Sequence, residues 1–134
     1  MNRELVTAMD LLPTIAALVD APLPEGRTID GHDISALLSD EDGATSPTDH
    51  FLYYSAKGEL AAIRRGAWKL MLQYGELYDV EVDVSEQWNL AEKNPEQVAE
   101  LRALAEAGDG RITAEARPVR HVEETLFDPR KPED

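Results

Sequence analysis

The feature that most constrains the fold is a series of four short apolar segments, separated from one another by turns that contain glycine. The segments are HFLYYSA from His50, the run from Leu60 to Arg65, the run from Trp68 to Tyr74, and LYDV from Leu77. Aromatic and apolar residues at this density favour strands, and glycine permits the tight reversals that join antiparallel neighbours. The sequence therefore predicts a four-stranded antiparallel meander.

A long helix is predicted after the fourth segment and an acidic turn that follows it. Asn94 is a suitable N-cap, Pro95 suits the first helical position, and Gln97 stands at the spacing of a capping-box partner. Gly108 stands where such a helix would end. The apolar stripe between them consists of Val98, Leu101, Leu104 and Ala105. Because this helix can cover one face of the meander, we expect a small α+β unit.

The first fifty residues carry a weaker pattern. Asp10 precedes LLPTIAALVD, which predicts a helix from Leu11 to Asp20 with a buried stripe of Ile15, Leu18 and Val19. From Ala21 to Asp49 the chain is rich in Pro, Gly, Asp and Ser. That composition predicts a connector with one or two helical turns at ISALL and a backbone turn at Gly31.

Composition excludes several classes of protein. The chain has 134 residues, 43% of them hydrophobic, which suffices for one core. A formal net charge of -14 opposes binding to nucleic acid or to an anionic membrane. The absence of cysteine excludes disulfides, thiolate metal sites and a cysteine nucleophile. Neither a signal peptide nor a membrane span is recognisable, so the sequence assigns no compartment.

Reactive groups do not form a known motif. No two of the histidines, His32, His50 and His121, have the spacing of a metal site. The chain also has no glycine-rich phosphate loop and no GxSxG elbow. EVDVSE differs from a calcium loop, so we expect Asp83 or Ser85 to accept backbone N–H bonds in a turn. His50 begins the first strand and is a candidate to project into a cleft.

The basic and aromatic residues admit two interpretations. Arg64, Arg65 and Lys69 either face an anionic ligand group or point alternately to solvent from a half-buried strand. The large aromatic residues are interpreted as core or sheet-face residues, namely Tyr53, Tyr54, Trp68 and Trp88.

Four stretches of the chain match the ending of one known family in order. They are VTAMDLLPTIAALVDAPLP, IDGHDISALL, FLYY with GELAAIRRGAWKLML, and ELYDVEVDVSEQWNLAEKNPEQVAELRALAE. Together they resemble the C-terminal part of the sulfatases, in the alkaline phosphatase superfamily, from about Val6 to Ala107. The resemblance implies a four-stranded antiparallel sheet with one long helix, preceded by a helix and connector from the end of a larger α/β domain.

The resemblance divides the chain into three parts. Residues 1–48 are the helix and connector at the tail end of the large domain, 49–110 are the C-terminal subdomain, and 111–134 are an extended tail. The partner that it implies is the large catalytic domain of the parent sulfatase, with self-association through an orphaned interface as an alternative contact.

The same resemblance sets the functional expectation. Sulfatases hydrolyse sulfuric esters with a formylglycine made in a CxPxR or SxPxR motif, a calcium ion, and Lys, Arg and His around the sulfate. These groups precede the segment matched here, so the resemblance implies no catalytic and no metal residue in this chain, which is expected to be inactive alone. The subdomain would close the active-site cleft and help to select substrate, with His50 and Lys57 as candidate substrate-binding residues. The alternative is a free-standing interaction module that has lost the catalytic domain.

Two details depart from the family pattern. Val82, Asp83 and Val84 stand where the family usually has Asn-Asp-Pro, so the turn lacks a stiffening proline. The hairpin from Ser55 to Glu59 replaces a Glu-His or similar pair at the rim of the active site.

Overall fold

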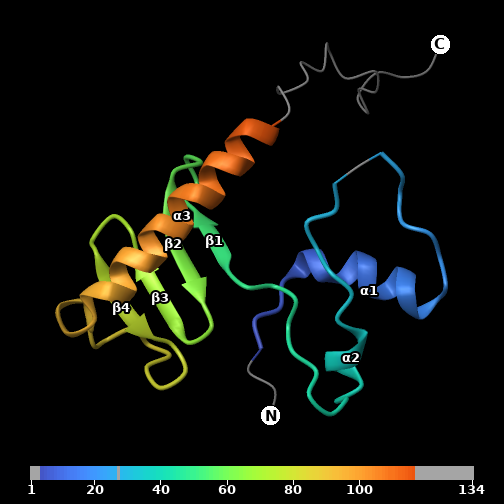
Figure 1. Ribbon diagram of the computed structural model, residues 1–134, viewed down its shortest axis with the longest axis horizontal. Helices are drawn as coiled ribbons and strands as arrows, with labels where there is room; N and C mark the ends of the chain where they lie inside the picture. The colour runs from blue at the N-terminus through green and yellow to red at the C-terminus, as the bar shows by residue number, and fades with distance from the viewer. Residues whose placement is uncertain (1–3, 27, 117–134) are drawn as a thin grey trace, which may run out of the picture.

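The computed structural model describes residues 4–26 and 28–116. The predicted tail beyond residue 116, with His121, lies outside the described residues. Figure 1 shows the elements, which are η1 (Ala8–Asp10), α1 (Leu11–Leu18), α2 (Ser35–Leu38), β1 (Phe51–Tyr54), β2 (Leu60–Arg65), β3 (Trp68–Met71), β4 (Glu76–Asp79), η2 (Ala91–Lys93) and α3 (Pro95–Glu115).

The four strands form one antiparallel sheet in chain order, which confirms the predicted meander. The register places Leu52 opposite Ile63, Ile63 opposite Leu70, and Leu70 opposite Leu77. Because directly paired residues point to the same face of a sheet, these four side chains form one apolar row across it.

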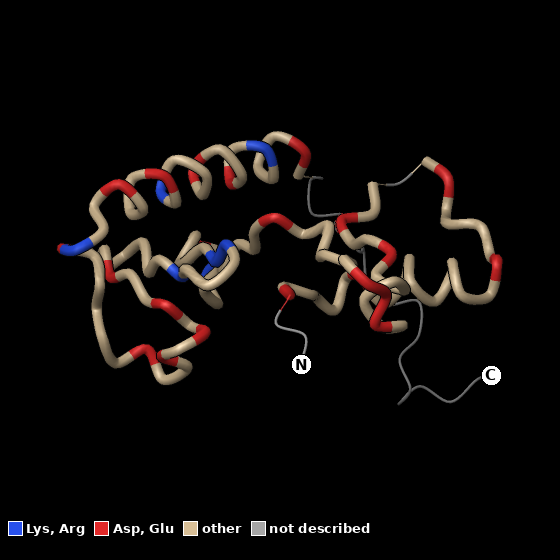
Figure 2. Tube along the Cα trace, turned by 60° about the horizontal axis from the view of Figure 1, so that its bottom comes forward, with Lys and Arg blue, Asp and Glu red and all other residues tan. Residues whose placement is uncertain are grey.

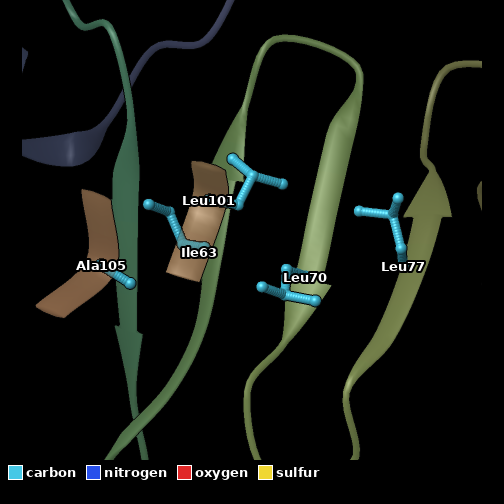
Figure 3. Close-up of a cluster of buried hydrophobic side chains, with 5 residues drawn as sticks. All are labelled: Ile63, Leu70, Leu77, Leu101 and Ala105. Carbon is cyan, nitrogen blue, oxygen red and sulfur yellow. The ribbon is translucent and has the colours of Figure 1, made fainter. Parts of the chain in front are cut away.

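The core lies between that row and α3, so the predicted α+β fold is confirmed. Figure 3 shows Ile63, Leu70 and Leu77 on three adjacent strands, with Leu101 and Ala105 on the helix. All five side chains are fully buried. Val98 and Leu104 pack against this cluster, as the predicted stripe requires.

Helix α3 continues beyond its predicted end. Gly108 lies inside the helix, which ends at Glu115, so the first residues of the predicted tail are helical. A Cβ atom at Gly108 would lie 2.9 Å from Leu52 Cδ1 and 3.6 Å from His50 Nε2. The glycine is therefore explained by the close approach of α3 to β1 and not by helix termination.

The start of α3 agrees with the prediction in part. Pro95 occupies the first turn and Asn94 precedes it, as expected. The predicted capping box is wrong, because the Asn94 side chain makes no cap hydrogen bond. Its Nδ2 instead donates to the Leu90 carbonyl oxygen at 3.0 Å, across the 3-10 turn η2 that the sequence pattern did not reveal.

The N-terminal elements form a separate small unit beside the sheet. Helix α1 packs on η1 and on the single helical turn α2. Figures 1 and 2 both show that α3 covers one face of the sheet, whereas α1 and α2 lie to one side of it. The helix predicted over residues 11–20 ends at Leu18, and Asp20 adopts a left-handed conformation with φ of 53°.

The predicted buried stripe of α1 is wrong. Ile15, Leu18 and Val19 are 57%, 65% and 65% exposed, whereas the buried residues of the helix are Pro13, Thr14 and Ala16. Helix α1 contains no charged residue, as Figure 2 shows. The face of α1 with the smaller side chains turns inward, because Thr14 accepts a hydrogen bond from the connector. The face with the larger apolar side chains is therefore exposed to solvent in this chain.

Replacement of Leu101 by alanine tests the core. Deleting a fully buried leucine side chain is expected to lower the free energy of unfolding by about 2–5 kcal/mol. Ile112→Ala on the same helix is the matched control, because Ile112 is 45% exposed and its truncation should cost less than about 1 kcal/mol. Urea unfolding followed by circular dichroism measures both values, and equal losses would contradict the assignment of the core.

Candidate functional site

The two predicted substrate-binding residues lie at opposite ends of β1. His50 directly precedes the strand, and Lys57 lies in the turn that follows it. The 4 residues of β1 separate them by about 13 Å of extended backbone. The structure therefore does not bring His50 and Lys57 together, and their proposed role stays a prediction.

His50 packs against α3. Its Nδ1 lies 3.2 Å from Asp49 Oδ2, and the side chain is 23% exposed. Its Nε2 faces the glycine position of α3 at Gly108. Asp49 thus orients an imidazole that is largely covered by the helix.

Lys57 lies at the exposed hairpin between β1 and β2. The Ser55 Oγ accepts hydrogen bonds from the backbone N–H groups of Lys57 and Glu59, both at 3.2 Å. The Ser55 N–H donates to the Glu59 carbonyl oxygen at 2.8 Å. Ser55 therefore braces the turn from which the Lys57 side chain extends.

Arg65 joins three parts of the chain. Its Nε donates to Asp49 Oδ1 at 3.0 Å, and its Nη1 donates to Glu100 Oε1 at 2.6 Å. Asp49 leads into β1, Arg65 ends β2, and Glu100 belongs to α3. The pKa of the Asp49 carboxyl is lowered, because hydrogen bonds and charges from His50 and Arg65 outweigh burial, which alone would raise it.

The other two members of the basic cluster point away from α3. Arg64 and Lys69 pair across β2 and β3, and the Arg64 Nε donates to the Gly66 carbonyl oxygen at 3.0 Å. Lys69 Nζ lies 2.6 Å from Glu86 Oε1 and 5.3 Å from the centroid of the Tyr53 ring. These internal contacts favour the interpretation of Arg64, Arg65 and Lys69 as structural residues on alternate faces.

A cavity of about 540 Å³ lies where the N-terminal segment meets the sheet. Neither His50 nor Lys57 lines it. The start of the described chain, the turn between β2 and β3, and the loop after β4 all line this cavity. The lining residues are Glu4, Leu5, Thr48, Asp49, Arg65, Gly66, Ala67, Trp68, Glu81, Gln97 and Glu100.

Asp10 anchors the N-terminal unit. Its side chain is fully buried and makes no capping hydrogen bond to α1, the helix that it precedes. Asp10 Oδ2 accepts hydrogen bonds from Thr7 N at 2.6 Å and Thr7 Oγ1 at 3.1 Å, while Oδ1 accepts one from His32 N at 2.9 Å. Thr14 Oγ1 donates to the Asp10 carbonyl oxygen at 2.6 Å and accepts from Ile34 N at 3.1 Å. Residues 32–34 are thereby fixed to the start of α1.

Gly31 is explained by the same anchor. A Cβ atom at this position would lie 1.9 Å from the Met9 carbonyl oxygen, which no side chain can tolerate. We predicted a backbone turn at Gly31, but the structure assigns none there. The glycine allows the connector to lie directly on the backbone of η1.

The loop after β4 is organised by two side chains. Asp83 Oδ2 accepts hydrogen bonds from Gln87 N at 2.7 Å and Trp88 N at 2.8 Å, which confirms the expected local bonding. Asn89 was missed by sequence reasoning. Its Oδ1 accepts from Leu77 N at 3.1 Å and Ala91 N at 2.9 Å, and the tendency of Asn to bond the backbone two residues onward was the available signal.

Several large apolar side chains are exposed, and two sets of them are close together in the sequence. In the loop after β4, Trp88 is 64% exposed, so its assignment to the core or sheet face is wrong. Tyr53 and Trp68 do lie in the sheet as expected, and Tyr54 bonds Asp109 of α3 through its hydroxyl at 2.9 Å. The second exposed set lies in and around η1 and α1 and consists of Val6, Met9, Leu11, Leu12, Ile15, Leu18 and Val19.

The described residues offer no evident place for a metal. Within residues 4–26 and 28–116, no group of three or more His, Cys, Asp or Glu residues is arranged to hold a metal ion. Over the same described ranges, none of the helices has the length and apolar character of a membrane span.

The chain is similar in sequence and in structure to known sulfatases. The chain is 44% identical to human steryl-sulfatase over 62 residues, which cover 46% of this chain. It is 28% identical over 125 residues to the N-acetylgalactosamine-6-O-sulfatase of Bacteroides thetaiotaomicron, covering 79% of this chain. A solved structure labelled 6S-sulf, from work on the metabolism of multiple glycosaminoglycans by Bacteroides thetaiotaomicron, matches with a TM-score of 0.58 and 28% identity over 76% of this chain.

These relatives are much longer than the matched region. The matches cover 10% of the human steryl-sulfatase, 24% of the N-acetylgalactosamine-6-O-sulfatase and 24% of the solved chain. No protein-family model matches the chain.

Replacement of Asp10 by asparagine tests the anchor. Burial alone would raise the pKa of Asp10, but hydrogen bonds from His32 and Thr7 lower it below the ordinary value of 3.8. The stabilisation is therefore full above pH 3.8 and is lost as the pH falls through the lower pKa of the folded state. Asp10→Asn should cost about 1–3 kcal/mol at neutral pH because a buried acceptor is replaced by an amide.

The loss should appear as faster hydrogen exchange of the His32 amide, which donates to Asp10 Oδ1, and the difference from wild type should shrink in acid. Asp30→Asn is the control, since Asp30 is exposed in the same connector. Equal exchange rates of the His32 amide in wild type and Asp10→Asn at pH 7 would refute the anchor.

Proposed function

We propose that the chain, which is similar to sulfatases over part of their length, serves a sulfuric ester hydrolase as its C-terminal subdomain. In this role it closes one wall of the active-site cleft and helps to select the organic part of the sulfate ester. The catalytic groups belong to a large domain that precedes it in the parent protein.

The uncovered apolar surface of α1 is the observation that carries the proposal. The sheet and α3 bury a complete core, whereas α1 exposes most of its apolar side chains to solvent. A helix that is apolar nearly all round is normally buried within a larger protein. This exposure supports the division in which residues 1–48 are the tail end of the large domain and residues 49–110 are the subdomain.

Catalytic chemistry is assigned elsewhere because this chain lacks the required groups. Sulfatases use a formylglycine and calcium, but the sequence contains neither a CxPxR nor an SxPxR motif. Within the described residues, no group of three or more His, Cys, Asp or Glu residues is arranged to hold a metal ion. No chemical step is therefore attributed to this chain, and the chain alone is expected to be inactive.

Substrate selection is the contribution that remains for the subdomain. Lys57 supports this role better than His50, because its side chain extends from an exposed hairpin that Ser55 braces. An ammonium group at that place suits an ester that carries additional negative charge. His50 is mostly covered by α3 and held by Asp49, so it contributes chiefly by shaping the start of β1.

Lys57→Ala in the parent sulfatase tests the role in substrate selection. We expect kcat/KM for a 6-O-sulfated N-acetylgalactosamine within an anionic glycosaminoglycan to fall about tenfold, the equivalent of one charged contact. For a steryl sulfate, whose organic part is uncharged, kcat/KM should change little. His50→Ala should give a smaller change. Lys93→Ala is the matched control, because Lys93 is an exposed lysine in η2.

Steady-state kinetics over both substrates measure the ratio of the two kcat/KM values. A ratio that is the same in wild type, Lys57→Ala and Lys93→Ala would remove Lys57 from substrate selection.

A further inference from the structure

The loop that joins β4 to η2, residues 80–90, turns its large apolar side chains outward. Val82, Val84 and Trp88 are 73%, 81% and 64% exposed. Single exposed apolar residues are common, but a soluble loop rarely displays three of them. Asp83 lies between two of them and is 6% exposed, so the usual distribution of polar and apolar side chains is reversed.

Hydrogen bonds hold the loop in this arrangement. Asp79 accepts from Glu81 N through Oδ1 at 3.1 Å and from Asp83 N through its carbonyl oxygen at 2.8 Å. Asp83 in turn binds the backbone N–H groups of Gln87 and Trp88. Lys69 pairs with Glu86 and fixes the middle of the loop to β3.

The apolar side chains are consequently presented on a pre-formed backbone. A partner that covers them does not have to order the loop, so little of the binding free energy is lost to loop ordering. This property is expected of a contact surface and has no evident use in a loop that faces water only.

The position of the loop indicates what covers it. Glu4 and Leu5 line the same cavity as Glu81, the residue next to Val82. Ser46 fixes this start of the chain, because its N–H donates to Glu4 Oε2 at 2.8 Å and its hydroxyl donates to the Leu5 carbonyl oxygen. The start of the described chain, at Glu4 and Leu5, is therefore held at the same cavity as Glu81 of the loop. Figure 1 shows the blue start of the chain running between the sheet and α1.

We propose that Val82, Val84 and Trp88 form a contact surface for the domain that precedes this chain in its parent protein. The inference rests on the proposed function, because it requires such a domain. The exposed face of α1 begins a few residues after Leu5, on the other side of the same chain start. One preceding domain can therefore cover both surfaces.

Charge disfavours the main alternative occupant. A second copy of the chain would bring a formal charge of -14 against another -14. Repulsion of this size opposes close association of two identical chains. A covalently attached domain avoids the cost of bringing two molecules together, because its effective concentration at the loop is high.

Hydroxyl-radical footprinting of Trp88 tests the proposal. The oxidation rate of Trp88 is measured in the 134-residue chain and in the native protein purified from its source. Tyr74 is the internal control, because it is 66% exposed and lies in the turn between β3 and β4, at the other end of the sheet. In a longer native protein we expect the oxidation rate of Trp88 to be lower by a factor of about five or more, as for a residue at the core of an interface. The oxidation rate of Tyr74 should be unchanged.

Three other outcomes overturn the inference in distinguishable ways. A longer native protein in which Trp88 reacts as fast as in the 134-residue chain removes this contact and leaves the proposed function intact. A native protein no longer than this chain removes both. Protection of Trp88 that depends on the concentration of the 134-residue chain assigns the surface to a second copy.

A pair of variants separates contact from folding. Val82→Ser combined with Val84→Ser should leave the thermal midpoint of the 134-residue chain unchanged, because both side chains are exposed. In the longer native protein the same change should raise the oxidation rate of Trp88 toward that of the isolated chain. Tyr74→Ser is the matched control and should leave the rate unchanged. A double variant with wild-type Trp88 protection would contradict the proposed contact.

Discussion

The described structure depends on burying one face of a short meander beneath α3. The row from Leu52 to Leu77 makes one face of the sheet apolar, so that face requires a cover that keeps it from water. Leu101 and Ala105 provide it, and Gly108 lets the helix continue at close range over β1. The polar ties from α3 to the sheet follow from this approach, with Arg65 bonding Glu100 and Tyr54 bonding Asp109.

The N-terminal unit is built on a different principle. Its centre is a buried carboxylate, Asp10, whose bonds hold the connector against the start of α1. Such a centre fixes a backbone conformation but buries little apolar surface. The larger face of α1 consequently stays exposed, and the apolar loop after β4 is exposed on the other side of the chain start. The described chain therefore combines a buried core between the sheet and α3 with two exposed apolar surfaces outside that core.

Sequence patterns predicted those parts of the fold whose burial partners lie within the chain. The meander, the start of α3 at Pro95 and the role of Asp83 follow from turn chemistry and local spacing. The patterns failed where the outcome depends on what a residue meets in space. Gly108 looks like a helix end until Leu52 is placed against it. Ile15 looks buried because an apolar stripe is assumed to have a cover, and that cover is not in the described residues.

The candidate site was predictable to a smaller extent. The prediction of His50 and Lys57 rests on strand ends and a resemblance, and neither argument reveals that β1 holds the two residues apart. Asn89 was missed because its two bonds, to Leu77 and Ala91, join residues that only the folded loop brings together.

The most direct test of the central claim is the intact mass of the native protein, purified from its source with an antibody raised to this chain. The account predicts a species several times heavier than 14.9 kDa, with a catalytic domain that covers α1. A native species of 14.9 kDa that stays monomeric would contradict it, because the exposed apolar surfaces would then have no preceding domain to meet.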